Sequence, residues 1–371
     1  MISVADALEK VFALCTPLDV ETVPLRRAHG RVLAKDAVAK RDQPPFASSA
    51  MDGYGVLDLD VPVGMQFTVI GESAAGHGFD GTLSKGDAVR IFTGAPVPEG
   101  ITRVIIQEDV SREGDVITVT ETLSENTNIR PLGGDFRIGD RVTAPRRLSA
   151  QDVALLAAMN IPEVTVTRRP VVALIATGDE LVMPGETPGP SQILASNSFG
   201  LAAMIEEAGG IARMLPIAPD NETALRATFE LAQGADVIVT IGGASVGDHD
   251  LVGKVAADMG LDRAFYKVAM RPGKPLMAGR LQGAVMIGLP GNPVSSLVTA
   301  KLFLIPALCA MQGLPAAPAP RHKAPLLQDI SANGPRAHYM RARLETGGIR
   351  PFERQDSSLM SILSSANVLL V

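Results

Sequence analysis

Residues 235–250 read ADVIVTIGGASVGDHD, and this stretch contains an apolar run rich in Val and Ile that stops at Gly242 and Gly243. A short apolar run bounded by turn residues is typical of a buried strand. The loop after the two glycines carries Ser245, Asp248 and Asp250. A turn that only ends a strand does not require so many polar side chains. The stretch therefore predicts a core strand whose C-terminal end meets a binding loop.

Strand-like and helix-like segments alternate on both sides of this stretch. PVVALIAT, IARMLPIA and AVMIGLPG have the apolar character of buried strands, and they are separated by helix-like segments at 196–210, 221–234 and 251–260. This alternation predicts a doubly wound α/β unit, with a mostly parallel sheet covered on both faces. Ligands of such sheets bind at the carboxyl ends of the strands.

The rest of the chain has a different texture and indicates further domains. Between residues 46 and 145, short β-branched runs alternate with Gly, Pro and Asp turns, which predicts an inserted β module. We expect 1–45 and 146–170 to form a helical and linker domain, and 171–312 to form the α/β domain. After a Pro-rich linker, residues 313–371 are expected to form a C-terminal β-barrel-like domain.

Composition limits the class of protein. The net charge of −6, from 34 basic and 40 acidic residues, argues against a nucleic-acid-binding surface. Cys15 and Cys309 fit neither a disulfide framework nor a metal spacing, which favours the reducing cytoplasm. The N-terminus reads as an amphipathic helix rather than a signal peptide. The most apolar stretch, 294–311, is interrupted by Lys301 and Pro306, so we expect a buried helix rather than a membrane span.

Polar residues gather where the predicted sheet strands end. They occur in ATGDEL (176–181), in the loop of 242–250 and in GLPGNPVSS (288–296). Small residues let backbone N–H groups approach a ligand, a helix N-terminus favours an anion, and converging acids suit a divalent cation. VAMRPGKP (268–275), with Lys267 just before it, adds cations suited to phosphate or another oxyanion. Together these loops predict a site for a phosphorylated or nucleotide-like ligand with a metal.

Each loop also has a simpler interpretation. Asp248 or Asp250 alone would serve as a helix cap, and Gly-Asn-Pro is a common junction between a turn and a helix. No Walker A or Gly-x-Gly-x-x-Gly motif is present, which disfavours an ordinary ATPase or dinucleotide enzyme. None of the five histidines has an evident Ser or Cys partner, which disfavours a Ser-His-Asp hydrolase. The convergence of several loops on one sheet edge favours a functional site.

Eight motifs in order carry a family resemblance: SAMDGYG (49–55), RIFTGAPVPEG (90–100), IQED (106–109), ATGDEL, SNS (196–198), GGASVGDHD, VAMRPGKP and LPGNPVSS. This set closely resembles the MoeA family of molybdopterin molybdenumtransferases, related to the gephyrin E domain, over nearly the whole chain. The resemblance implies an enzyme of molybdenum cofactor biosynthesis that inserts molybdate into adenylylated molybdopterin with Mg²⁺ and releases AMP. It also implies a cytoplasmic homodimer whose cleft lies between the central domain of one subunit and the β module of the other. Other proteins of cofactor biosynthesis are possible partners, whereas nucleic acid and membrane are not expected.

The resemblance and the loop chemistry together give a set of candidate site residues. The expected catalytic residues are Asp52, Thr93, Glu180 and Asp250, and of these Glu180 and Asp250 are the expected metal ligands. The expected substrate-binding residues are Asp220, Gly242, Gly243, Ser245, Lys267, Arg271, Lys274, Pro290, Asn292, Pro293 and Ser295.

Three positions depart from the family pattern and leave alternatives open. Ala47 and Ala195 stand where the family usually has an acid, and Arg271 stands where Lys is usual. One alternative is a catalytically altered paralogue that acts as a dimeric binding or scaffold protein; another is a molybdopterin adenylyltransferase. The flanking β domains argue against a lone adenylyltransferase domain, and the presence of Asp52 and Glu180 argues against a pure scaffold.

Overall fold

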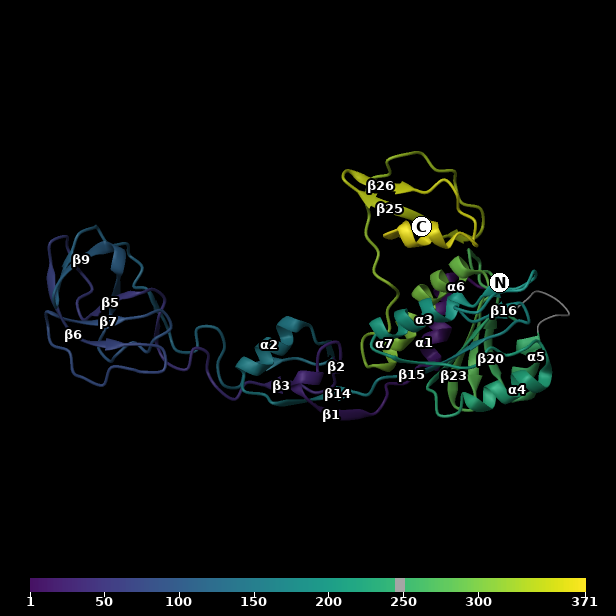
Figure 1. The fold of residues 1–371 in the computed structure, drawn as a ribbon, viewed down its shortest axis with the longest axis horizontal. Coiled ribbons are helices and arrows are strands. Elements are labelled where there is room, and N and C mark those ends of the chain that lie inside the picture. Colours follow the sequence, from purple (N-terminus) through teal and green to yellow (C-terminus); the bar gives the residue numbers. More distant parts are fainter. Residues whose placement is uncertain (244–250) are drawn as a thin grey trace.

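The computed structural model describes residues 1–243 and 251–371 and shows an elongated molecule (Figure 1). The β module lies at one end and the α/β unit at the other, with a small unit containing α2 between them. The C-terminal unit, drawn in yellow, sits beside the α/β unit.

The α/β unit is built on a six-stranded sheet with the order β18-β15-β19-β23-β22-β20. Its strands are β15 (Val171–Ala176), β18 (Ile211–Met214), β19 (Val237–Ile241), β20 (Asp262–Tyr266), β22 (Met277–Leu281) and β23 (Ala284–Leu289). The first four strands in this order are parallel; β22 runs antiparallel to β23, and β20 runs antiparallel to β22 and hence in the direction of the first four. The predicted doubly wound sheet is confirmed, with an antiparallel edge in addition.

Helices cover both faces of this sheet, and each face has its own apolar core. One face carries α1 (Val4–Leu14), α3 (Ser196–Glu207), α6 (Pro293–Thr299) and α7 (Ile305–Met311); the other carries α4 (Glu222–Leu231) and α5 (Leu251–Asp258). The position of α1 differs from the expected grouping of residues 1–45 with 146–170. Its buried face, which includes Val4, Leu8 and Val11, packs into the α/β core instead.

The segment from Pro293 to Met311 is one helix, with a π-helical turn at Ala300–Leu304 between α6 and α7. It is long and apolar enough to cross a membrane, but 78% of its most apolar window is buried inside the protein. The helix contacts α3 and α1. The prediction of a buried core helix is confirmed.

The middle unit is formed by the two chain segments that flank the β module. Its sheet has the order β1-β14-β2-β13, made of β1 (Val20–Pro24), β14 (Glu163–Thr167), β2 (Val32–Leu33) and β13 (Arg146–Arg147). A second pair joins β3 (Ala37–Val38) to β12 (Arg141–Val142), and a 3-10 turn spans Leu25–Arg27. The unit's helix is α2 (Ala150–Ala158), which begins at a capping box between Ser149 and Asp152.

The β module contains a six-stranded sheet in the order β8-β5-β7-β6-β10-β9. These strands are β5 (Gly53–Val56), β6 (Gln66–Ser73), β7 (Asp87–Ile91), β8 (Arg103–Ile106), β9 (Val110–Glu113) and β10 (Val116–Val119); β4 (Ser48–Ser49) pairs with β11 (Ile129–Arg130), and a 3-10 turn spans Gln107–Asp109. No α-helix occurs between residues 46 and 145, all of which the structure describes.

The C-terminal unit is joined to the α/β unit by strand pairing. β24 (Ala337–His338) pairs with β21 (Met270–Arg271), which belongs to the VAMRPGKP segment. The sequence predicted a barrel-like domain here, but the structure has a three-stranded sheet of order β26-β25-β27 and one short helix. These elements are β25 (Met340–Glu345), β26 (Gly348–Pro351), β27 (Val368–Leu370) and α8 (Met360–Ser365). Between residues 314 and 336 the pairing is limited to a parallel bridge from Leu326 to Ile349 of β26, so a barrel is not confirmed.

Candidate functional site

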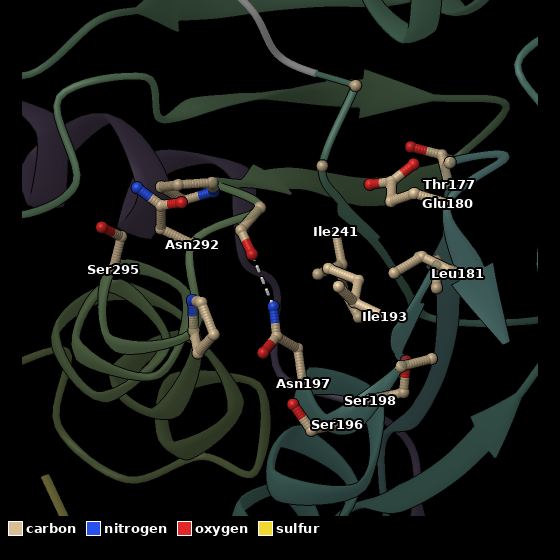
Figure 2. Close-up of a pocket in the computed structure, with 18 of the residues that line it drawn as sticks. Thr177, Glu180, Leu181, Ile193, Ser196, Asn197, Ser198, Ile241, Asn292 and Ser295 are labelled. Atoms are coloured by element: carbon tan, nitrogen blue, oxygen red, sulfur yellow. Dashed lines mark hydrogen bonds between the residues drawn. The ribbon is translucent and has the colours of Figure 1, made fainter. Parts of the chain in front are cut away.

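A cavity of about 880 Å³ opens at the carboxyl ends of β15, β19 and β23 (Figure 2). The walls come from the loop after β15, from the small parallel pair β16 (Leu181–Val182) and β17 (Ile193–Leu194), from the start of α3 and from the start of α6. Ser358 of the C-terminal unit also lines it. The cavity is where the sheet topology predicts a ligand.

This cavity collects most of the candidate residues of the α/β unit. Those that line it are Glu180, Asp220, Gly242, Gly243, Pro290, Asn292, Pro293 and Ser295. Ser245 and Asp250 lie outside the described residues. Asn292 occupies the N-cap position of α6, but its side-chain Nδ2 donates to Ser357 Oγ at 2.9 Å rather than capping the helix.

Gly178 determines where the Glu180 carboxylate lies. Gly178 has φ +144°, and a Cβ atom at this position would overlap the Glu180 carboxylate. The glutamate side chain therefore folds back over the glycine, beside Thr177 (Figure 2). A side chain at position 178 would push the carboxylate out of this place.

The backbones of two strand-end loops approach each other closely. Gly243 has φ +65°, and a Cβ there would overlap the Val252 side chain and lie 2.9 Å from Thr177 Oγ1. A Cβ at Gly291 would lie 3.5 Å from the Cα of Gly242. The glycines thus permit the close backbone approach that the sequence predicted.

Two buried polar atoms of the cavity wall have no hydrogen-bond partner among the described residues: Thr177 Oγ1 and Asn197 Oδ1. Asn197 is held in place because its Nδ2 donates to the Gly291 carbonyl at 2.7 Å (Figure 2). Buried polar atoms are nearly always paired, so these two atoms are available to a ligand. Leu181, Ile193 and Ile241 add an apolar part to the cavity lining (Figure 2).

The charge of the cavity wall is negative. Desolvation, followed by the charges of Asp179 and Glu180, raises the pKa of Asp220, whose backbone N–H donates to Asp179 Oδ1 at 3.1 Å. No Lys or Arg is among the described residues that line the cavity. Hard carboxylate oxygens without a cation suit Mg²⁺. However, no group of three or more His, Cys, Asp or Glu residues with metal-site geometry occurs within 1–243 and 251–371. The described acids by themselves therefore do not make up a three-ligand metal site.

The predicted cations do not line this cavity. Arg271 lines a second cavity, of about 500 Å³, next to the C-terminal unit. Lys267 Nζ lies 4.8 Å from the centre of the Tyr266 ring, and Lys274 lines neither cavity. Arg271 lies away from the main cavity because its strand, β21, pairs with β24 of the C-terminal unit.

Arg341, which the sequence analysis did not single out, lies close to Arg271 and His338, two residues that line the second cavity. It is fully buried, its Nη2 donates to the Asp356 carbonyl at 2.8 Å, and its Nε and Nη1 have no partner among the described residues. His338 Nε2 is also buried without a partner there. Burial, followed by the charges of Arg271, Arg341 and Arg336, lowers the pKa of His338. Buried, unpaired donors next to several cations suit an oxyanion.

Asp52 and Thr93 form a pair in the β module. Asp52 Oδ1 accepts hydrogen bonds from Thr93 N and Thr93 Oγ1, both at 2.7 Å, and these bonds lower the pKa of Asp52. The sequence predicted a shared role for these residues, and the structure brings them into contact. Within one chain, however, the pair lies at the far end of the molecule from the cavity, at the ends of β5 and β7 (Figure 1).

Three family models match the chain and together span nearly all of it. They are the MoeA N-terminal region (domain I and II) at residues 2–160, a probable molybdopterin binding domain at 173–310, and the MoeA C-terminal region (domain IV) at 323–371.

Named relatives and solved structures agree with these matches. A molybdopterin molybdenumtransferase of Nostoc sp. (strain PCC 7120) is 37% identical over 330 residues, covering 85% of this chain and 75% of the relative. Molybdopterin molybdenumtransferase 2 of Mycobacterium tuberculosis H37Rv is 35% identical over 374 residues, covering 96% and 91%. The crystal structure of the molybdopterin biosynthesis moeA protein from Pyrococcus horikoshii OT3 is similar with a TM-score of 0.83 and 30% identity, covering 100% of this chain and 94% of that one.

Proposed function

The chain belongs to the MoeA family, and on that premise we propose that it is a molybdopterin molybdenumtransferase of molybdenum cofactor biosynthesis. The substrates are adenylylated molybdopterin and molybdate, and AMP is released. The observation that carries the proposal is the strand-end cavity, where close backbone loops, two carboxylates and two unpartnered polar atoms meet an apolar side.

The cavity offers complementary surfaces to the parts of a nucleotide-linked pterin. Leu181, Ile193 and Ile241 suit the face of a flat ring, because ligand pockets are mostly apolar with a few placed polar groups. Thr177 Oγ1 and Asn197 Oδ1 suit ring or ribose polar atoms. The glycine loops after β19 and β23 allow backbone N–H groups to approach phosphate.

Magnesium fits the acidic part of the cavity. Glu180 and Asp220 would hold it, together with Asp250, which lies outside the described residues. When bound, Mg²⁺ supplies positive charge to the phosphoanhydride oxygens. The carboxylates would hold the metal in the cavity, and the absence of a side chain at Gly178 leaves room for the Glu180 carboxylate.

Arg271, Arg341 and His338 lie where the α/β unit meets the C-terminal unit. The positive charge of the two arginines supports a binding site for molybdate in this region. Arg341 carries two unpartnered buried nitrogens, and Arg271 and His338 lie in the same region. Arg271 and His338 line the second cavity, and a tetrahedral dianion bound there would pair with the Arg271 guanidinium. Ser358, from the same C-terminal unit, lines the main cavity.

A homodimer explains the separation of the two parts of the site. The Asp52–Thr93 pair cannot reach the cavity of its own chain, as the elongated shape shows (Figure 1). The β module of a second copy completes the cavity in this proposal. A cytoplasmic enzyme is in keeping with the two unpaired cysteines.

The test supplies the purified protein with adenylylated molybdopterin, Mg²⁺ and molybdate and measures AMP release. We expect Glu180→Gln to reduce release by at least about 10–100-fold, because loss of even an outer-shell partner of a metal ligand has an effect of this size. Glu186→Gln is the matched control, because the Glu186 carboxylate accepts from Met183 N and does not line the cavity. Tight binding without turnover in the wild type would instead support the scaffold, and AMP addition from ATP would support the adenylyltransferase.

A further inference from the structure

We propose that Arg90 is a positioning residue, which holds the Asp52–Thr93 pair in the geometry that the AMP-releasing reaction needs. This inference rests on the proposed function, since it assigns Arg90 a role through Asp52. Arg90 lies in β7, three residues before Thr93, and β7 is the strand next to β5, before which Asp52 lies.

Two aromatic rings fix the plane of the Arg90 guanidinium. Its Cζ lies 4.9 Å from the centre of the Tyr54 ring and 4.8 Å from the centre of the Phe92 ring. A planar guanidinium gains cation–π attraction at such distances and loses rotational freedom. The group therefore has a defined orientation.

In this orientation the guanidinium bridges Gly53, which directly follows Asp52, and Gln107, which begins the 3-10 turn after β8. Arg90 Nη1 donates to the Gly53 carbonyl at 3.2 Å, and Nη2 donates to Gln107 Oε1 at 2.6 Å. The backbone N–H of Gln107 in turn donates to the Asp52 carbonyl at 3.0 Å. Asp52 is thus held from its C-terminal neighbour and through its own carbonyl, and both connections lead to Arg90.

The charge of Arg90 acts in the same direction as this geometry. The Thr93 hydrogen bonds lower the pKa of Asp52, and the Arg90 charge lowers it further. Among the described residues Arg90 forms no ion pair of its own, so its charge is not neutralised by a contacting acid. The arrangement keeps Asp52 ionised and fixed in place while Thr93 faces solvent.

The experiment compares Arg90→Lys with the wild type in the AMP-release assay, using the full-length protein. Lysine keeps the charge but lacks the planar guanidinium, so it cannot donate to the Gly53 carbonyl and to Gln107 Oε1 in the same geometry. We expect kcat to fall about tenfold, with the KM for adenylylated molybdopterin changed by no more than about twofold. Arg112→Lys is the matched control and should retain wild-type kcat: Arg112 also donates to a backbone carbonyl, that of Gly114, but from the far edge of the same sheet.

A double-mutant cycle distinguishes positioning from general stabilisation of the module. If Arg90 acts through Asp52, Arg90→Lys has no further effect on the residual activity of Asp52→Asn, because the two changes share one mechanism. Gln107→Ala removes the other end of the bridge without altering charge, and we expect a similar fall in kcat. Circular dichroism and thermal melting check that each variant is folded.

The outcomes separate this inference from the proposed function. Additive losses in Arg90→Lys and Asp52→Asn, or a wild-type kcat in Arg90→Lys, would overturn the role of Arg90 and leave the proposed function standing. Wild-type AMP release by Asp52→Asn would overturn the role of the Asp52–Thr93 pair and that of Arg90 together. No AMP release by the wild-type protein would overturn the proposed function itself.

Discussion

At the scale of single residues, the cavity depends on how two acidic side chains are held. Glu180 lies over a glycine that has no Cβ to obstruct it, and Asp220 is an acid whose pKa is raised by desolvation and by two neighbouring acids. The first feature fixes the position of a carboxylate, and the second concentrates negative charge. Both features can be tested by one substitution each.

Gly178→Ala should displace the Glu180 carboxylate. The new methyl group would overlap it, and φ +144° is unfavourable for alanine, so we expect AMP release to fall roughly 10–100-fold. Gly185→Ala is the control, because Gly185 has φ +99° but nothing within 4 Å of a Cβ. Equal losses in both variants would attribute the effect to backbone strain rather than to Glu180.

Asp220→Asn should stabilise the protein near neutral pH in the absence of metal. A carboxyl group whose pKa is higher in the folded than in the unfolded state stabilises the fold only while protonated, and this contribution is lost as pH rises through the folded pKa. Thermal melting from about pH 4 to 8 should show an advantage of the variant that grows as the pH rises.

Binding of Mg²⁺ should offset the negative charge of the Asp220 carboxylate. Mg²⁺ should raise the melting temperature of the wild type more than that of Asp220→Asn, because the variant has lost one ligand and one repulsive charge. Asp60→Asn, which changes an exposed acid of the β module, should respond to Mg²⁺ as the wild type does. An equal Mg²⁺ response in Asp220→Asn and the wild type would argue against Asp220 as a metal ligand.

At the scale of elements, two helices begin with the same capping box but in different surroundings. Ser3 and Asp6 cap α1 at an exposed site, whereas Ser149 and Asp152 cap α2 with Asp152 only 4% exposed. Asp152 also accepts from Ser149 Oγ at 2.8 Å and pairs with Arg146 at 2.6 Å. Removing the Asp152 carboxylate from the capping box of α2 therefore leaves more polar groups without a hydrogen-bond partner than removing Asp6 from that of α1.

Asp152→Ala should destabilise α2 by about 2–3 kcal/mol, and Asp6→Ala should destabilise α1 by about 0.5–1 kcal/mol. Hydrogen exchange of the helix amides measures each effect locally, which avoids treating a multidomain chain as two-state. A loss at Asp152 no larger than that at Asp6 would contradict the importance of burial.

At the scale of the whole molecule, the distance between the β module and the cavity predicts complementation between subunits. In the proposed homodimer, a mixture of Asp52→Asn and Glu180→Gln proteins after subunit exchange should regain up to about one quarter of wild-type activity, because about half of the dimers are then mixed and each of these has one intact cleft of two. The assay is AMP release before and after exchange. Asp52→Asn mixed with Thr93→Ala is the control and should regain nothing, because every cleft then contains an altered β module. No recovery in the first mixture would contradict a site shared between subunits.

The local order of the chain determined a large part of this fold. The apolar run of 235–241 with its two glycines and the alternating segments around it are properties of neighbouring residues, and the structure has the sheet and helices that they predict. The strand ends could also be located, because parallel strands with crossover helices place their carboxyl ends at one edge. The grouping of Glu180, Gly242 and Asn292 around one cavity followed from that topology.

Only the tertiary structure decided which long-range partners each segment meets. It placed α1 on the α/β sheet, paired β21 with β24 and so directed Arg271 away from the main cavity, and buried Arg341 beside His338. It also left Asp52 and Thr93 in contact with each other but far from Glu180 (Figure 1). The physical reason is that periodicity and turn chemistry depend on a few adjacent residues, whereas burial of a charge and pairing of distant strands depend on packing across the whole chain.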